Sequence, residues 1–209
     1  MKAMRKRPLT IALTGGLAAG KSEAMRTFAR CGAWTLSLDA LARRLSRKGA
    51  SVWRAVVRTF GRAALRPGGG LDREALAREV FRHPRRRRLL ERAAHPAILR
   101  EMRRRLSRCR SRVAVVDVPL LFERGLQREF DASVLVCAPS GARLARALRR
   151  GMPRSDALAR MRAQWPQRRK EAIADVVLRN DASLHDFRRA VRERFHAFRL
   201  IATSPQGDR

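Results

Sequence analysis

Tyrosine is absent from the 209-residue sequence, and aromatic residues make up only 5% of it. Proteins that bind single-stranded nucleic acid use aromatic rings as stacking platforms, so this composition argues against that class. Acidic residues are also scarce, with 18 Asp and Glu against 49 Lys and Arg, which gives a formal net charge of +31. We therefore expect an anionic partner, but the charge alone does not choose between nucleic acid, an acidic membrane and a phosphorylated small molecule.

Cysteine occurs only at Cys31, Cys109 and Cys137, and neither Cys-x-x-Cys nor a Cys/His ligand spacing is present. Zinc sites and disulfide frameworks need such spacings, so we expect reduced thiols. No stretch reaches the roughly 20 apolar residues that span a bilayer. The apolar run near the N-terminus leads into Gly-Lys-Ser rather than into a signal-peptide cleavage site. The sequence thus predicts a cytoplasmic protein with no membrane partner.

Apolar residues instead form short runs between helical patterns. These runs are Leu9–Leu13, Trp34–Leu38, Val113–Val118 and Ser133–Cys137. Short runs that contain β-branched residues and alternate with helices are typical of buried strands in a parallel sheet. We predict a single α/β domain with about five parallel strands flanked by helices.

Two helical segments interrupt this pattern. The first spans residues 41–112, with predicted breaks at Arg66–Arg73, His83-Pro84 and His95-Pro96. The second spans residues 141–169, is rich in arginine and reads as two helices around residues 149–156. We expect both segments to be helical excursions from one core.

Lysine is rare in this chain, yet Lys21 stands in a glycine-rich sequence between the first apolar run and a helical pattern. Gly15-x-x-x-x-Gly20-Lys21-Ser22 fits the phosphate-binding loop, in which backbone N–H groups and a helix N-terminus surround a polyphosphate. Lys21 would reach the β- and γ-phosphates of ATP, and the Ser22 hydroxyl would bind Mg²⁺. We assign nucleotide binding to Gly15, Gly16, Leu17, Ala18, Ala19, Gly20, Lys21, Ser22 and Glu23.

The phosphate-binding loop is shared by motors, GTPases and small-molecule kinases. The guanine-reading sequence Asn-Lys-x-Asp does not occur in the chain, which weighs against a GTPase. A short chain with an insert after the second strand and an arginine-rich segment after the fourth favours a kinase of the nucleoside-monophosphate type. In such kinases the insert holds the acceptor and the arginine-rich segment closes as a lid.

Five sequences occur in an order that is informative when they are taken together. They are LTGGLAAGKS at the loop, Gly70-Leu71-Asp72-Arg73, His95-Pro96, VPLLFE (Val118–Glu123) and Ala174–Asn180. From about Leu9 to Leu200 the chain resembles the dephospho-CoA kinase family. The resemblance implies a P-loop enzyme that uses ATP and Mg²⁺ to phosphorylate the ribose 3′-hydroxyl of dephospho-CoA, the last step of CoA synthesis.

The resemblance also implies a division of the single domain. The core would comprise about residues 9–43, 110–140 and 170–200, the acceptor-binding insert about 44–109, and the lid about 141–169. We expect a monomer. Two alternatives stay open: a kinase of another small metabolite or nucleotide, and a basic nucleic-acid-binding protein that uses the loop as a switch. Because the chain has no nucleic-acid reading motif, we expect no specific nucleic-acid partner.

The family's catalytic aspartate falls on Asp39, where the resemblance implies a carboxylate that orients the acceptor hydroxyl and takes its proton. An aspartate at the carboxyl end of a strand points into the crevice where α/β folds bind ligands. The alternative is an N-cap for a helix that begins at Ala40. The chain departs from the family at Ser37, usually an acidic residue, and at Glu23, usually threonine.

Three further residues are candidates for metal binding and catalysis. Asp117 closes an apolar strand and could hold Mg²⁺ through water, with strand-end capping as its alternative. Arg146 and Arg150 match lid arginines of the family, and a guanidinium group suits the charge of a transferring phosphoryl group. The alternative for each arginine is a solvated surface position.

The insert contributes three candidates for binding the acceptor, all by resemblance. They are Asp72, Arg73 and His95. His95 could instead cap a helix that starts with Pro96, because proline is favoured at the first helical position.

Overall fold

The computed structural model describes residues 7–203, apart from the side chains of residues 80–82, 84 and 87. The chain divides into two compact units. The first contains the chain up to Ser37 and from Cys109 onward, and the second is Leu38–Arg108. This second unit, called the insert below, starts before the predicted bound at about residue 44 and therefore includes Asp39. Among the described residues, no helix has both the length and the apolar character needed to cross a bilayer.

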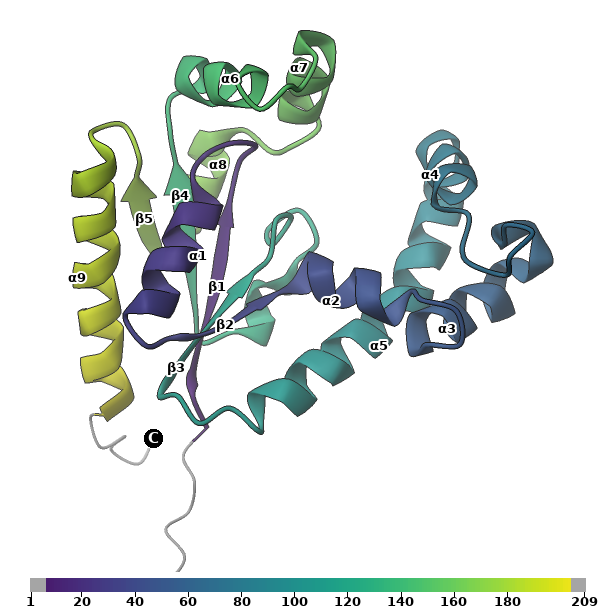
Figure 1. The fold of residues 1–209 in the computed structure, drawn as a ribbon, viewed down its shortest axis with the longest axis horizontal. Helices are drawn as coiled ribbons and strands as arrows, with labels where there is room; N and C mark the ends of the chain where they lie inside the picture. Colours follow the sequence, from purple (N-terminus) through teal and green to yellow (C-terminus); the bar gives the residue numbers. More distant parts are fainter. Residues whose placement is uncertain (1–6, 204–209) are drawn as a thin grey trace, which may run out of the picture. The chain divides into compact units, whose positions relative to one another are not determined.

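The first unit is built on a five-stranded sheet in the order β2-β3-β1-β4-β5 (Figure 1). Its strands are β1 (Leu9–Gly15), β2 (Trp34–Ser37), β3 (Val113–Asp117), β4 (Ala132–Cys137) and β5 (Val176–Arg179). Every neighbouring pair is parallel. The predicted α/β fold is confirmed, and the four apolar runs are strands whose ends differ slightly from the predicted ones.

Helices connect and flank these strands. They are α1 (Lys21–Arg30), α6 (Ser140–Leu148), α7 (Arg154–Arg162), α8 (Gln167–Glu171) and α9 (Leu184–Thr203), with a 3₁₀ turn η2 (Leu126–Glu129). The pair of helices predicted within residues 141–169 is confirmed as α6 and α7. Pro153 directly precedes α7, a position where the missing N–H of proline costs nothing.

The core of the first unit lies between the sheet and the neighbouring helices α1 and α9 (Figure 1). Ile11 and Leu13 of β1 pack in one cluster with Phe28 of α1 and Phe187 of α9. Burial of each such side chain stabilises the fold by about 1.5–3 kcal/mol. Val116 of β3, outside this cluster, is equally inaccessible, as expected for a parallel sheet covered on both faces. The carboxyl ends of the strands therefore form the edge where a ligand can bind.

The second unit consists of helices. They are α2 (Leu38–Leu45), α3 (Ser51–Phe60), α4 (Arg73–Arg82) and α5 (Pro84–Leu106), with a 3₁₀ turn η1 (Gly61–Ala64). Helix α3 packs on α5, and the unit buries Val52, Val56 and Met102. The breaks predicted at Arg66–Arg73 and His83-Pro84 are confirmed, because α4 begins at Arg73 and a new helix begins at Pro84.

The break predicted at His95-Pro96 is wrong, because α5 continues through both residues. An interior proline costs a helix about 3 kcal/mol. Ile98 and Met102 follow on the same helix and are buried, at 9% and 0% exposure. Their packing offsets the hydrogen bond that Pro96 cannot make, so tertiary contacts override the local signal. The same finding excludes His95 as the cap of a helix starting at Pro96.

The capping alternative for Asp39 is also wrong. Helix α2 begins at Leu38, directly after β2, so Asp39 lies inside its first turn. An N-cap residue precedes the helix and has non-helical backbone angles. Asp39 is exposed, and its carboxylate therefore remains accessible from solvent.

A buried ion pair in the first unit joins Lys170 of α8 to Glu123. Lys170 Nζ lies 2.6 Å from Glu123 Oε1, and the two side chains are 3% and 12% exposed. The same carboxylate oxygen accepts a hydrogen bond from the backbone N–H of Trp165 at 3.1 Å. Removing one partner of such a pair leaves an uncompensated charge in the interior.

We expect Lys170→Met to lower the free energy of unfolding by about 3–5 kcal/mol, because Glu123 would stay buried without its cation. Adding Glu123→Gln should recover more than half of that loss, since no buried charge then remains. Urea unfolding of both variants measures this. Lys48→Met, at an exposed lysine, is the control and should change stability by less than about 0.5 kcal/mol. An equally small loss in Lys170→Met would contradict the buried pair.

Candidate functional site

The loop between β1 and α1 has a backbone that two of its glycines make possible. Gly15 and Gly20 have φ angles of +156° and +117°. A Cβ atom on Gly15 would lie 2.5 Å from the carbonyl oxygen of Val136, and one on Gly20 would lie 2.2 Å from Nδ2 of Asn180. Neither position accepts a side chain, so the loop is held tightly between β4 and the residue that follows β5.

Ala18 lies in the same loop with a φ angle of +54° and is the non-glycine residue with positive φ among the described residues. This left-handed conformation costs an L-residue about 1–2 kcal/mol. The surrounding contacts hold the loop in this shape. Strain of this kind is concentrated at ligand-binding sites.

Lys21 is the first residue of α1, and its Nζ donates a hydrogen bond to the Gly15 carbonyl oxygen at 3.0 Å. The ammonium group therefore folds back over the loop. Ser22 follows with an exposed side chain. Gly20 stands at the N-cap and has no side chain to cap the helix. A lysine and a helix N-terminus that converge on one loop form a site for an anion.

A cavity of about 320 Å³ opens beside this loop. It is lined by Ala18, Ala19, Gly20, Lys21, Ser22, Glu23, Arg26, Arg146, Arg150, Asn180, Ala182 and Leu184. A second cavity of about 300 Å³ adjoins it and shares Ala18 and Arg150 with it. The first cavity thus brings six of the predicted loop residues, 18–23, together with both predicted lid arginines. Leu17 lines the second cavity, and Gly15 and Gly16 line neither of these two.

Asn180 connects three parts of the site, and sequence reasoning assigned it no role. It is 8% exposed, and its Nδ2 donates to the Ala19 carbonyl oxygen at 2.7 Å. The backbone carbonyl oxygen of Asn180 accepts a hydrogen bond from Nη2 of Arg146 at 3.2 Å. Asn180 ends the motif Ala174–Asn180, which supported the family resemblance but predicted no contact for this residue. Asn180 holds both the loop and Arg146 in place.

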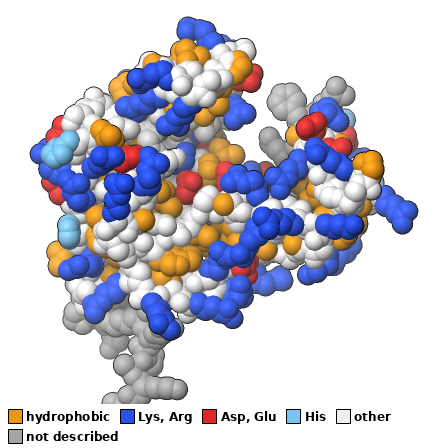
Figure 2. Space-filling view, in the orientation of Figure 1, with side chains coloured by type: hydrophobic (Ala, Val, Ile, Leu, Met, Phe, Trp, Pro, Cys, Tyr) orange, Lys and Arg blue, Asp and Glu red, His pale blue; other side chains and the backbone are white. Residues whose placement is uncertain are grey.

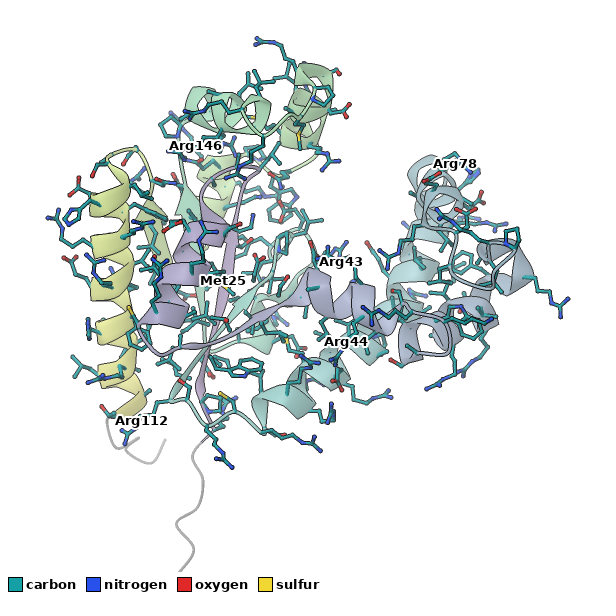
Figure 3. The ribbon with its side chains drawn as sticks, viewed as in Figure 1. Met25, Arg43, Arg44, Arg78, Arg112 and Arg146 are labelled. Atoms are coloured by element: carbon teal, nitrogen blue, oxygen red, sulfur yellow. The ribbon has the colours of Figure 1, made fainter. Side chains whose placement is uncertain are left out.

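Arg146 lies on α6 above the carboxyl ends of β4 and β5 (Figure 3). Its Nη1 atom is buried and has no hydrogen-bond partner among the described residues. A buried guanidinium N–H without a protein partner costs free energy until an acceptor reaches it. A phosphate oxygen in the cavity would be such an acceptor. Arg146 therefore fits the predicted role better than a solvated surface arginine.

Glu23 lines the cavity, and its negative charge is paired with two arginine side chains. It accepts a hydrogen bond from Arg26, and its Oε1 accepts another from Nε of Arg188 at 2.6 Å. These guanidinium groups, Arg26 first and Arg188 second, hold the pKa of Glu23 below its ordinary value. The charge expected to repel a phosphate is thus balanced by two cations.

Asp117 closes β3 and lies in register between Leu13 of β1 and Ser37 of β2. It therefore stands at the edge of the sheet from which the phosphate loop departs. Within residues 7–203, no group of three or more His, Cys, Asp or Glu side chains is arranged to hold a metal ion. A hydroxyl from Ser22 and a carboxylate from Asp117 are hard oxygen donors of the kind that Mg²⁺ prefers.

The remaining predicted residues belong to the insert. Asp39 is exposed in the first turn of α2, and His95 is half-buried within α5. Asp72 caps α4 by accepting from the N–H groups of Glu74 and Ala75 at 3.1 and 3.0 Å. The N–H of Ala75 is the main cause of the lowered pKa of Asp72.

Arg73 begins α4 and reaches the carbonyl oxygen of Arg43 at 3.4 Å. Asp72 and Arg73 thus have structural contacts of their own. Arginine and lysine side chains are scattered over the face in view rather than gathered into one tract (Figure 2).

Comparison with known proteins gives consistent results. A family model for dephospho-CoA kinase matches residues 9–186. The dephospho-CoA kinase of Frankia casuarinae is 40% identical over 88% of this chain and 81% of its own length. That of Thermus thermophilus is 38% identical over 90% of both chains.

Solved structures are also similar to this chain. A crystal structure from Thermus thermophilus has a TM-score of 0.81 and 37% identity, covering 92% of this chain and 98% of its own. Shikimate kinase from Acinetobacter baumannii, at 16% identity and a TM-score of 0.52, covers 98% of this chain and 99% of its own and shares the fold alone. A matching family model and two relatives near 40% identity over most of both chains leave one conclusion: this chain belongs to the dephospho-CoA kinase family.

Proposed function

We propose that this protein transfers the γ-phosphoryl group of ATP to the ribose 3′-hydroxyl of dephospho-CoA, giving CoA and ADP, the last step of CoA synthesis. The observation that carries the proposal is the shared cavity of Lys21, the loop and the arginines Arg146 and Arg150, in a chain of this family. The loop would hold the polyphosphate and the arginines would approach it from the other side.

The chemistry of such a transfer asks mainly for positioning and for stabilisation of charge. The transition state of phosphoryl transfer is loose, with charge spread over the equatorial oxygens. Lys21 would contact the β- and γ-phosphates from the loop. Arg146, with its buried Nη1, would donate to phosphate oxygens from α6. Arg150, exposed on the same cavity, would add a second guanidinium group as the lid closes.

Ser22 and Asp117 would hold Mg²⁺, the first through its hydroxyl and the second through a water molecule. When bound, the metal neutralises charge on the β- and γ-phosphates. The donor set fits, because few protein oxygens combined with substrate phosphates and water are the usual ligands of this ion. The family implies ATP use, and the assignment of these two residues is our proposal.

The insert would bind dephospho-CoA, with Asp72, Arg73 and His95 as its contacts and residues 141–169 as the lid. Asp39 would accept the proton of the 3′-hydroxyl and orient it toward the γ-phosphate. Its exposed carboxylate is free of the capping role that competed for it. We also propose a monomeric, cytoplasmic protein without a specific nucleic-acid partner.

An ADP-release assay over a panel of acceptors tests the proposed function. The panel contains dephospho-CoA, shikimate, nucleoside monophosphates and no acceptor. We expect ADP release only with dephospho-CoA and expect CoA as the second product by mass spectrometry. Release of ADP with another acceptor in preference to dephospho-CoA would overturn the proposed substrate.

Lys21→Ala should lower kcat by about 10²–10³-fold, because a cation that stabilises the transferring phosphoryl group is removed. Circular dichroism should show an intact fold, since the Lys21 side chain is not part of the hydrophobic core. Lys48→Ala in the insert is the matched control. Activity of Lys21→Ala within a few-fold of the wild type would refute the assignment of the loop.

Asp39→Asn should lower turnover with dephospho-CoA by about 10²-fold while the affinity for ATP stays unchanged, because general-base help is at the low end of its range for a loose transition state. Steady-state kinetics and calorimetric titration with ATP measure the two quantities. Glu74→Gln is the matched control, because Glu74 also lies exposed in the first turn of an insert helix. Unchanged turnover in Asp39→Asn would exclude the base.

Glu23→Thr should tighten ATP binding by about two- to fivefold, because a negative charge leaves the start of α1 and Arg26 loses its carboxylate partner. Arg26 lines the cavity and would become available to the nucleotide. Calorimetric titration with ATP and Mg²⁺ is the measurement, with exposed Glu193→Thr as the control. Weaker binding would show that Glu23 is needed to orient Arg26 and Arg188.

A further inference from the structure

The segment between α7 and β5 begins within the predicted lid and approaches the phosphate loop, although no residue of it was predicted to belong to the site. Two hydrogen-bonding groups attach it to Glu123, at the end of the VPLLFE sequence. The backbone N–H of Trp165 and the ammonium group of Lys170 both bind Oε1 of this residue, at 3.1 and 2.6 Å. Two attachments on one buried carboxylate fix the position of the backbone at residue 165.

Gln164 is the residue immediately before this attachment. Its Oε1 accepts a hydrogen bond from the backbone N–H of Leu17 at 3.1 Å, across 147 positions of sequence. Leu17 lies in the half of the loop that follows β1, away from the start of α1. A side chain from outside the loop therefore holds one of the loop's own N–H groups.

A second side chain, from α6, covers this half of the loop. A Cβ atom on Gly16 would lie 1.9 Å from Nη1 of Arg143 on α6 and 3.5 Å from Oε1 of Gln164. Nε of Arg143 is buried and has no hydrogen-bond partner among the described residues. Removal from water lowers the pKa of this guanidinium, a cost that an anion in the loop would reduce. The surroundings of Leu17 thus suit a phosphate group.

We propose that Gln164 contacts the terminal phosphate of ATP, holding the Leu17 N–H through Oε1 and donating to that phosphate through Nε2. A carboxamide has one carbonyl oxygen, which accepts, and one NH₂ group, which has two N–H donors. With the acceptor bound to Leu17, the donors of the same group are left for the ligand. Glu123 and Lys170 are positioning residues, because they act through the backbone that carries Gln164.

This inference rests on the proposed binding of ATP at the loop and deepens it by naming a residue that distinguishes a triphosphate from a diphosphate. A purely structural role of Gln164 would affect both nucleotides equally, because both use the same loop. A contact to the terminal phosphate affects only the triphosphate. The ratio of the two affinities therefore separates the roles.

Gln164→Glu is the sharpest variant, because it keeps the size of the side chain and an oxygen that can accept from Leu17. It replaces the donors with a second, negatively charged oxygen. We expect the affinity for the non-hydrolysable analogue AMPPNP with Mg²⁺ to fall about tenfold or more, since a hydrogen bond to a charged group is lost and repulsion is added. The affinity for ADP should change less than about threefold. Calorimetric titration of the full chain measures both.

Two further variants complete the experiment. Gln127→Glu makes the same chemical change at an exposed glutamine and should leave both affinities unchanged. Gln164→Ala removes the donor without adding charge and should lower the AMPPNP-to-ADP affinity ratio by about fivefold. Urea unfolding shows whether Gln164→Glu is stable. If it is not, Gln164→Ala still gives the affinity ratio, because alanine adds no charge to the interior.

Equal weakening of AMPPNP and ADP in either Gln164 variant, or an unchanged affinity ratio, would overturn the contact and leave Gln164 as a residue that only closes the loop. Failure of the wild-type protein to bind either nucleotide would instead overturn the nucleotide site itself. The two failures are thus distinguishable by the wild-type titration alone.

Discussion

The site depends on one steric constraint, the absence of space for a Cβ atom at Gly15 and Gly20. Gly15 lies against the carbonyl oxygen of Val136 on β4, and Gly20 lies against the amide of Asn180 after β5. These contacts press the loop onto the carboxyl edge of the sheet. They also fix where α1 begins, and therefore where Lys21 and the helix N-terminus stand. A larger residue at either position would displace the loop and every group that it orients.

The few acidic residues of this basic protein act mainly as partners of specific cations. Glu123 holds Lys170 and the backbone of Trp165, and Glu23 holds Arg26 and Arg188. Loss of the Glu23 carboxylate would leave two guanidinium groups without their shared anion. Charge balance at the site is therefore set by a small number of acidic side chains rather than by the net charge of +31.

Local signals and the structure disagree at two places in the insert. Pro96 was expected to end a helix, yet α5 continues because Ile98 and Met102 are buried beyond it. Asp39 was a candidate N-cap for a helix beginning at Ala40, yet α2 starts two residues earlier, at Leu38, directly after β2. An interior proline costs a helix about 3 kcal/mol, which burial of two apolar side chains can offset.

The sequence by itself determined the parallel sheet, the phosphate loop and the family, because apolar runs, glycine spacing and the order of five motifs are local properties of the chain. It also located Arg146 and Arg150, although only among many arginines. The tertiary structure alone decided which side chains meet. Gln164 and Asn180 reach the loop from positions 147 and 161 residues away from their partners, and no periodicity or spacing records such a contact. Hydrogen bonds and ion pairs between distant segments depend on the path of the whole backbone, which the burial of the core sets.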